Sequence, residues 1–144
     1  MKAQSILIFF VVAVLSMPAF GQDISKQQVR FANKFIDAVS TNNSKKVIKM
    51  LDKGYKKEQL KILAGNKEQL INELFGGEDL TDHSIYVTIK LDEIKKIEIA
   101  EVIQLKGGEG YNYIFRVKSD RFEVHSSLRL KKRGCKYGFE GAYG

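Results

Sequence analysis

The spacing of apolar residues changes along the chain from a helical period to strict alternation. Between residues 25 and 75, apolar side chains recur every three or four positions, as on one face of an amphipathic helix. Between residues 85 and 139 they occupy every second position, as in strands with one buried face. The pattern predicts an α+β domain in which N-terminal helices pack on one face of an antiparallel meander.

Four helices are predicted in the first half. The first begins at a capping box formed by Ser25 and Gln28 and runs to about Ser40. The others are separated by a polar loop and by glycines, which readily adopt the left-handed conformation that follows a helix end. The expected boundaries are the loop 41–44, Gly54, Gly65 with Asn66 as the next N-cap, and the pair Gly76 and Gly77.

Five alternating runs in the second half predict strands joined by short turns. Glycines between residues 107 and 110 mark one turn, and Ser119-Asp120 marks another. A third turn is predicted at residues 132–134, so that Cys135 opens the last strand. There it is expected as a small buried residue, and the alternatives are a reactive thiol or a bridge to another chain. The predicted strands are 85–90, 97–105, 111–117, 122–130 and 135–139.

Residues 1–21 have the pattern of a secretory signal peptide. Lys2 gives a basic start, residues 6–15 form an apolar run, and small residues precede an expected cut after Gly21. The run is shorter than the roughly 20 residues that span a bilayer. We therefore expect a single domain of residues 22–144 that works in the periplasm or is secreted, which excludes most nucleotide, nucleic-acid and central metabolic functions.

Two segments resemble the NTF2-like superfamily in its small exported bacterial form. Residues 35–47 look like the opening helix, short polar turn and second helix of that family, and residues 122–139 look like its last long hairpin. The resemblance implies a curved sheet wrapped around a helix, an NTF2-like or cystatin-like cone that often holds an apolar pocket. Because this fold hosts enzymes, carriers and structural modules, the resemblance selects no single function.

Positive charge gathers in two places. The formal net charge is +7, and removal of residues 1–21 leaves +6. Six lysines between residues 45 and 57 are typical of a solvated helix face. The denser cluster on the last hairpin is a candidate contact surface for an acidic protein or envelope polymer. The alternative is that this charge only keeps the protein soluble. Its residues are Arg129, Lys131, Lys132, Arg133 and Lys136.

Glu123 and His125 are weak catalytic candidates. They alternate along one predicted strand, so their side chains lie on the same face about 7 Å apart. A carboxylate at that distance can bias the pKa of an imidazole and support acid–base catalysis. The same wholly polar face also fits a solvated strand, because the lining of a pocket is mostly apolar. Two histidines and one cysteine lack the spacing of a metal site, and the glycines at 107–110 fit a hairpin better than a phosphate loop.

These features favour a non-catalytic binding module of the bacterial envelope, with no cofactor, metal or nucleic acid. Its partner would be a protein or a small apolar ligand, bound by the concave side of the sheet or by the basic turn. The alternative is a small hydrolase or isomerase that uses Glu123 and His125. We expect a monomer or a homodimer formed through the sheet, without a membrane span.

Overall fold

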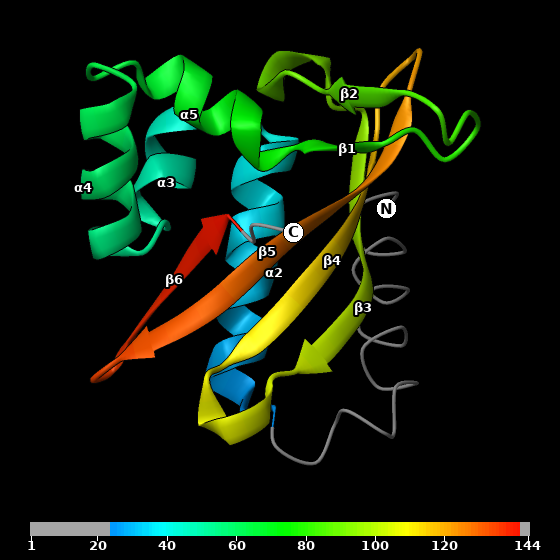
Figure 1. Ribbon diagram of the computed structural model, residues 1–144. Helices are drawn as coiled ribbons and strands as arrows, with labels where there is room; N and C mark the ends of the chain where they lie inside the picture. The colour runs from blue at the N-terminus through cyan, green and yellow to red at the C-terminus, as the bar shows by residue number, and fades with distance from the viewer. Residues whose placement is uncertain (1–23, 142–144) are drawn as a thin grey trace.

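The computed structural model describes residues 24–141, and it confirms the α+β class. Helices form the first half of this range and a four-stranded antiparallel sheet forms the second, in the predicted order (Figure 1). Within the described range, no helix is both long and apolar enough to cross a bilayer. The helices are α2 (Lys26–Ser40), α3 (Ser44–Lys49), α4 (Lys53–Ile62) and α5 (Lys67–Leu74).

Helix α2 begins where the sequence predicts, but its capping box is only half formed. The Ser25 Oγ accepts a hydrogen bond from the Gln28 backbone N–H at 3.1 Å. The Gln28 side chain does not accept a hydrogen bond from the Ser25 backbone N–H, as a full capping box requires. It turns into the core, where its Nε2 donates to the Tyr113 hydroxyl at 2.8 Å. The prediction of a full box was wrong because a buried hydroxyl gives this amide a partner inside the protein.

The second predicted helix is shorter than expected, and Gly54 does not end it. Helix α3 stops at Lys49, and Gly54 lies in the first turn of α4. The chain leaves the helix early because it pairs with the last strand on both sides of Phe139. The Phe139 N–H donates to the Met50 carbonyl at 2.9 Å, and the Asp52 N–H donates to the Phe139 carbonyl at 2.7 Å.

The meander forms one sheet in the order β3-β4-β5-β6. Each strand pairs with its neighbour in sequence, as expected for runs joined by short turns. The glycine-rich turn between the first two strands has positive φ at Gly107, Gly108 and Gly110, a conformation that glycine adopts without strain. The strands are β3 (Lys96–Gln104), β4 (Tyr111–Lys118), β5 (Glu123–Arg133) and β6 (Lys136–Gly141).

The first predicted strand belongs to a separate two-stranded sheet. Gly76 and Gly77, predicted to close a helix, instead begin β1 (Gly76–Glu78), which pairs with β2 (Tyr86–Thr88). A Cβ at Gly77 would lie 2.4 Å from the His125 carbonyl oxygen, so β1 crosses β5 at a distance that only glycine allows. The prediction was wrong because a glycine pair occurs where two backbones lie close together as well as at the end of a helix.

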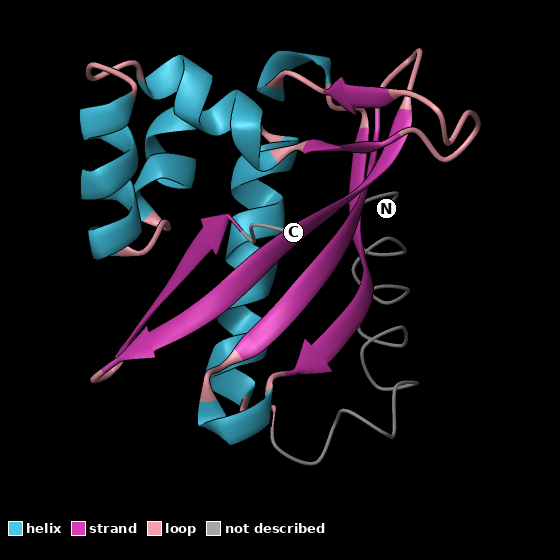
Figure 2. Cartoon of the chain, viewed as in Figure 1, coloured by secondary structure: helices cyan, strands magenta, loops and turns pink. Residues whose placement is uncertain are grey.

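Aromatic rings fill the space between α2 and the sheet. Helix α2 lies behind the sheet in Figure 2, along the face that carries the buried residues of the strands. The Phe35 ring lies 4.6 Å from that of Phe139 and 5.6 Å from that of Phe115, and Tyr113 packs beside them. These residues are at most 2% exposed. The other face of the sheet, turned away from α2, is called the outer face below.

Candidate functional site

The structure divides the five basic residues of the last hairpin between two faces. Strands β5 and β6 are joined through Gly134 and Cys135, and Arg133 pairs with Lys136. Because side chains alternate along a strand, four of the five lie on the outer face and only Lys132 lies on the α2 side. Its ammonium sits 5.6 Å from the centre of the Tyr137 ring. The four are Arg129, Lys131, Arg133 and Lys136.

An acidic residue lies between two of these cations in space, although none does in the β5 sequence. Glu140 on β6 pairs in register with Arg129. Its carboxylate lies 3.6 Å from the Arg129 guanidinium and 3.0 Å from the Lys131 ammonium. Glu140 was not predicted at this position because the turn was expected at residues 132–134. The two-residue turn at 134–135 sets the register that brings Glu140 to this position.

Arg133 joins the hairpin tip to the start of α4. Its Nε and Nη2 donate to the two carboxylate oxygens of Asp52, at 2.8 and 3.1 Å. The Asp52 side chain is 3% exposed, whereas that of Arg133 is 61% exposed. Asp52 also caps α4, because its Oδ2 accepts the Tyr55 N–H at 3.1 Å. One buried carboxylate therefore fixes two segments that are 81 residues apart.

The surroundings of Asp52 keep its carboxylate ionised. Burial alone would raise the pKa of this group. Hydrogen bonds from the Tyr55 backbone and the Arg133 guanidinium, together with the charges of Arg133 and Lys131, outweigh that effect. The net result is a pKa below the usual value of 3.8, so the ion pair is present at neutral pH.

Close backbone contact at Gly138 brings Asp52 to this position. A Cβ at Gly138 would lie 2.6 Å from the Asp52 Cα and 2.8 Å from its backbone nitrogen. Only glycine leaves room for the segment between α3 and α4 to run along the edge of β6. Apart from the glycine itself, no local pattern indicates this contact, since Asp52 and Gly138 are distant in the chain.

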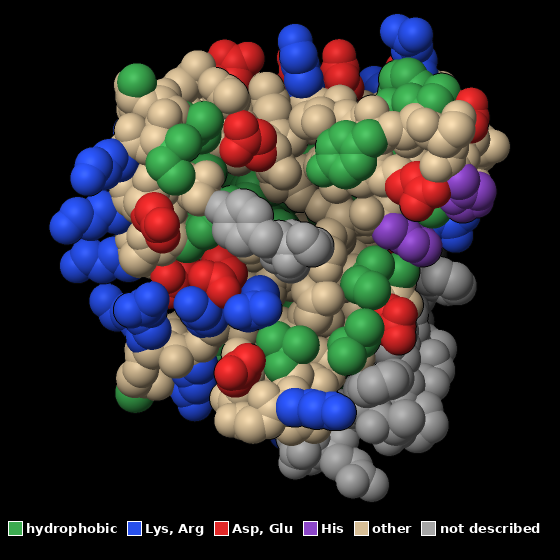
Figure 3. All heavy atoms as spheres, viewed as in Figure 1, with side chains coloured by type: hydrophobic (Ala, Val, Ile, Leu, Met, Phe, Trp, Pro, Cys, Tyr) green, Lys and Arg blue, Asp and Glu red, His purple; other side chains and the backbone are tan. Residues whose placement is uncertain are grey.

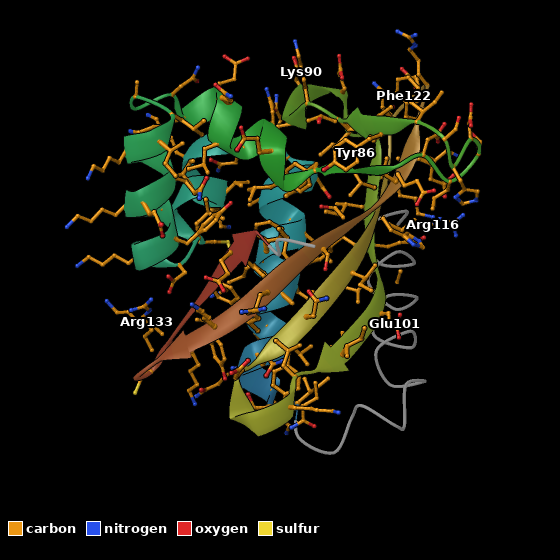
Figure 4. The ribbon with its side chains drawn as sticks, viewed as in Figure 1. Tyr86, Lys90, Glu101, Arg116, Phe122 and Arg133 are labelled. Carbon is orange, nitrogen blue, oxygen red and sulfur yellow. The ribbon has the colours of Figure 1, made fainter. Side chains whose placement is uncertain are left out.

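Helix α4 adds a row of lysines beside the hairpin tip. Lys53, Lys57 and Lys61 are four residues apart and exposed, so they follow one side of the helix. Arg133 lies against the first turn of this helix, with its Nη2 2.9 Å from where a Cβ of Gly54 would be. Figure 4 shows Arg133 at the tip of the β5–β6 hairpin, below the start of α4.

Three lysines of α4 and three cations of the hairpin form a continuous positive region, which we call the basic surface. Figure 3 shows Lys and Arg side chains gathered along the side of the molecule formed by α4 and the hairpin. Asp52 and Glu140 hold two of the cations in place, and the other four make no ion pair with any residue from 24 to 141. The basic surface comprises Lys53, Lys57, Lys61, Lys131, Arg133 and Lys136.

Cys135 is exposed, so the prediction that it is buried was wrong. It occupies the second position of the two-residue turn and does not open the last strand, which begins at Lys136. The error has the same origin as the missed Glu140, namely a turn placed too early in the chain.

Glu123 and His125 lie on the outer face of β5, as their alternation predicts. His125 is exposed, and the Glu123 carboxylate accepts a hydrogen bond from the Arg116 Nε. A small hollow of about 180 Å³ adjoins Glu123 and Arg116, and its other lining residues are Lys96, Glu98 and Lys118. His125 is not part of that lining. An acid–base role for the pair stays a prediction.

Aromatic rings from α2 and the sheet pack against one another between the helix and the strands. Phe35, Phe115 and Phe139 meet there, and the Tyr113 ring completes the cluster. Burial raises the pKa of the Tyr113 hydroxyl to about 12, so it remains a neutral partner of Gln28. Among residues 24–141, no three His, Cys, Asp or Glu side chains are grouped so that they could hold a metal ion.

Comparisons with protein-family models, with curated proteins and with solved structures found no match. The NTF2-like resemblance therefore stays a prediction.

Proposed function

We propose that the domain is a non-catalytic interaction module of the bacterial envelope that binds an acidic protein through the basic surface. The observation that carries this proposal is the Arg133–Asp52 ion pair. It holds the hairpin tip against the start of α4, so cations from two distant segments keep a fixed arrangement. A preformed surface of this kind binds with less loss of conformational freedom than one that must be ordered first.

The composition of the surface supports a protein partner. Complementary charge steers association and selects the partner, while an apolar contact contributes to affinity. Ile62 supplies such a contact, because it follows Lys61 on α4 and is 67% exposed. Glu58 is the single acidic residue within α4, so the lysine row dominates its charge.

A protein partner is better supported than a small apolar ligand in the fold interior. The rings around Phe35 pack against one another between α2 and the sheet, whereas the cations of the basic surface are exposed or half-buried. The predicted signal peptide supports an envelope location, where an NTF2-like module would work outside the cytoplasm.

Charge reversal at exposed positions tests the proposal. Lys57→Glu/Lys61→Glu alters the basic surface without touching the Asp52–Arg133 pair, and Lys34→Glu/Lys106→Glu is a matched control at exposed lysines elsewhere. A photo-crosslinking residue at position 53 would first identify the envelope protein in contact with α4. We expect the α4 double variant to bind that protein about 10- to 100-fold more weakly, and the control to bind like the wild type. Equal affinity of both variants, or no adduct specific to position 53, would overturn the proposal.

A further inference from the structure

A second hollow, which shares no residue with the basic surface, lies between α3, α5 and the short helix η1 (Leu91–Glu93). Its volume is about 600 Å³, within the range of about 300–1,000 Å³ that is typical of sites for small molecules. Three aliphatic side chains contribute its apolar part: Ile48 from α3, Ile71 from α5 and Leu91 from η1. Ile71 and Leu91 also belong to the core, so this apolar lining is continuous with the rigid interior.

Charged side chains accompany this apolar lining, and positive charge is in excess. Four lysines and two acidic residues line the hollow, and none of the six forms an ion pair with a residue in the described part of the chain. Nearby Lys46, by contrast, lies 3.9 Å from the Asp37 carboxylate. The cations are Lys45, Lys49, Lys67 and Lys90, and the acids are Glu68 and Asp92.

We propose that this groove binds a small amphipathic carboxylate, an apolar chain or ring system that carries one negative charge. The chain would lie on Ile48, Ile71 and Leu91, and the carboxylate would meet the lysines. Four lysines disfavour a cationic ligand. Glu68 and Asp92 on the same lining disfavour a polyanion, because like charges repel.

The volume sets the size of the ligand. If each non-hydrogen atom takes about as much space as one water molecule, roughly 30 Å³, the groove holds at most about 20 such atoms. A twelve-carbon carboxylate fits within that limit. Lys90 can reach a ligand that extends toward the η1 end, since it directly precedes η1 and projects from the upper end of the molecule (Figure 4).

Dodecanoate, kept below the concentration at which it forms micelles, is the probe for the test. It would be titrated into the ¹⁵N-labelled 22–144 protein while amide shifts are recorded. We expect saturable shifts confined to residues 45–49, 67–72 and 90–92, with a Kd below about 1 mM. Dodecyltrimethylammonium has the same chain with a cationic head, and it should not give these shifts.

Two double variants separate this site from general charge effects. Lys45→Glu/Lys90→Glu should weaken dodecanoate binding at least tenfold, because both lysines line the groove. Lys57→Glu/Lys61→Glu changes the net charge equally on the basic surface and should leave the Kd unchanged. Shifts spread over the sheet, equal binding of the cationic amphiphile, or equal loss in both variants would overturn the proposal. Since the amide spectrum also reports folding, an unfolded variant would be recognised and replaced by Lys49→Gln, for which we expect weaker binding.

Discussion

Asp52→Asn is the substitution that tests how the basic surface is held together. Asparagine has nearly the same size and keeps a side-chain oxygen that can cap α4 through the Tyr55 N–H. It removes the negative charge that receives both hydrogen bonds from Arg133. The substitution therefore isolates the ion pair from the helix cap.

The expected cost follows from the unequal exposure of the two partners. A hydrogen bond to a charged group contributes about 1.5–3 kcal/mol, whereas a solvent-exposed ion pair contributes about 0–1 kcal/mol. Asp52 is buried but Arg133 is mostly exposed, so water can solvate the released guanidinium. We expect Asp52→Asn to lower the free energy of unfolding by about 1–2 kcal/mol. Asp52→Ala also loses the cap and should cost about 1 kcal/mol more.

The effect should depend on pH with a definite sign. The pKa of Asp52 is lower in the folded protein than the usual 3.8, so its ionised form stabilises the fold above the unfolded-state pKa. This contribution is lost as the pH falls through the folded-state pKa. The difference in stability between the wild type and Asp52→Asn should therefore be complete at pH 6 and shrink below about pH 4.

Urea denaturation followed by circular dichroism measures these quantities, since the chain has no tryptophan. A double-mutant cycle with Arg133→Gln should give a coupling energy of about 1 kcal/mol at pH 6. Asp37→Asn is the control, because its contact with Lys46 is long and both side chains are exposed, and it should change stability by less than about 0.5 kcal/mol. An Asp52→Asn protein as stable as the wild type at pH 6, with zero coupling to Arg133, would refute the reasoning.

Two further predictions concern the edge and the tip of the last hairpin. Gly138→Ala should destabilise the protein by about 2 kcal/mol or more, because the added Cβ would clash with the Asp52 backbone. That backbone cannot move without breaking its hydrogen bonds to Phe139. Gly54→Ala should cost less than Gly138→Ala in urea titrations. Its Cβ would lie 2.9 Å from the Arg133 Nη2 and 3.3 Å from the Asp52 Oδ2, so it meets side-chain ends, which can shift, and no backbone atom. Exposed Cys135 should react with a thiol reagent in the native protein about as fast as in the unfolded chain. A native reaction that is slowed a hundredfold would show that the turn is buried.

Local patterns predicted the elements of this fold better than their contacts. The apolar period located α2 and α5, and the Asn66 cap appears as expected, with its Oδ1 accepting the Gln69 N–H at 3.0 Å. Alternation located the strands of the meander. Alternation did not show that β2 would pair with β1 outside the four-stranded sheet, because a short exposed run alternates in the same way in both sheets.

The candidate site was predicted only in part, because its decisive contacts are long-range. The hairpin cations could be read from the sequence, but nothing local connects Arg133 with Asp52. Two glycines carried the missing information: Gly77 was predicted to end a helix, and Gly138 was given no role. Gly77 and Gly138 lie where one backbone crosses or follows another too closely for a side chain.

A glycine without a turn beside it is therefore better interpreted as a possible point of close approach than as a flexible position. Applied to this chain, that interpretation places a backbone segment against Gly138 on the edge of β6. The segment must itself offer unpaired backbone groups, and the short link between α3 and α4 does so at Met50 and Asp52. Once that segment is placed, Asp52 is the acidic residue that can meet the hairpin tip, and the lysines of α4 follow beside it. The basic surface thus depends on a residue without a side chain.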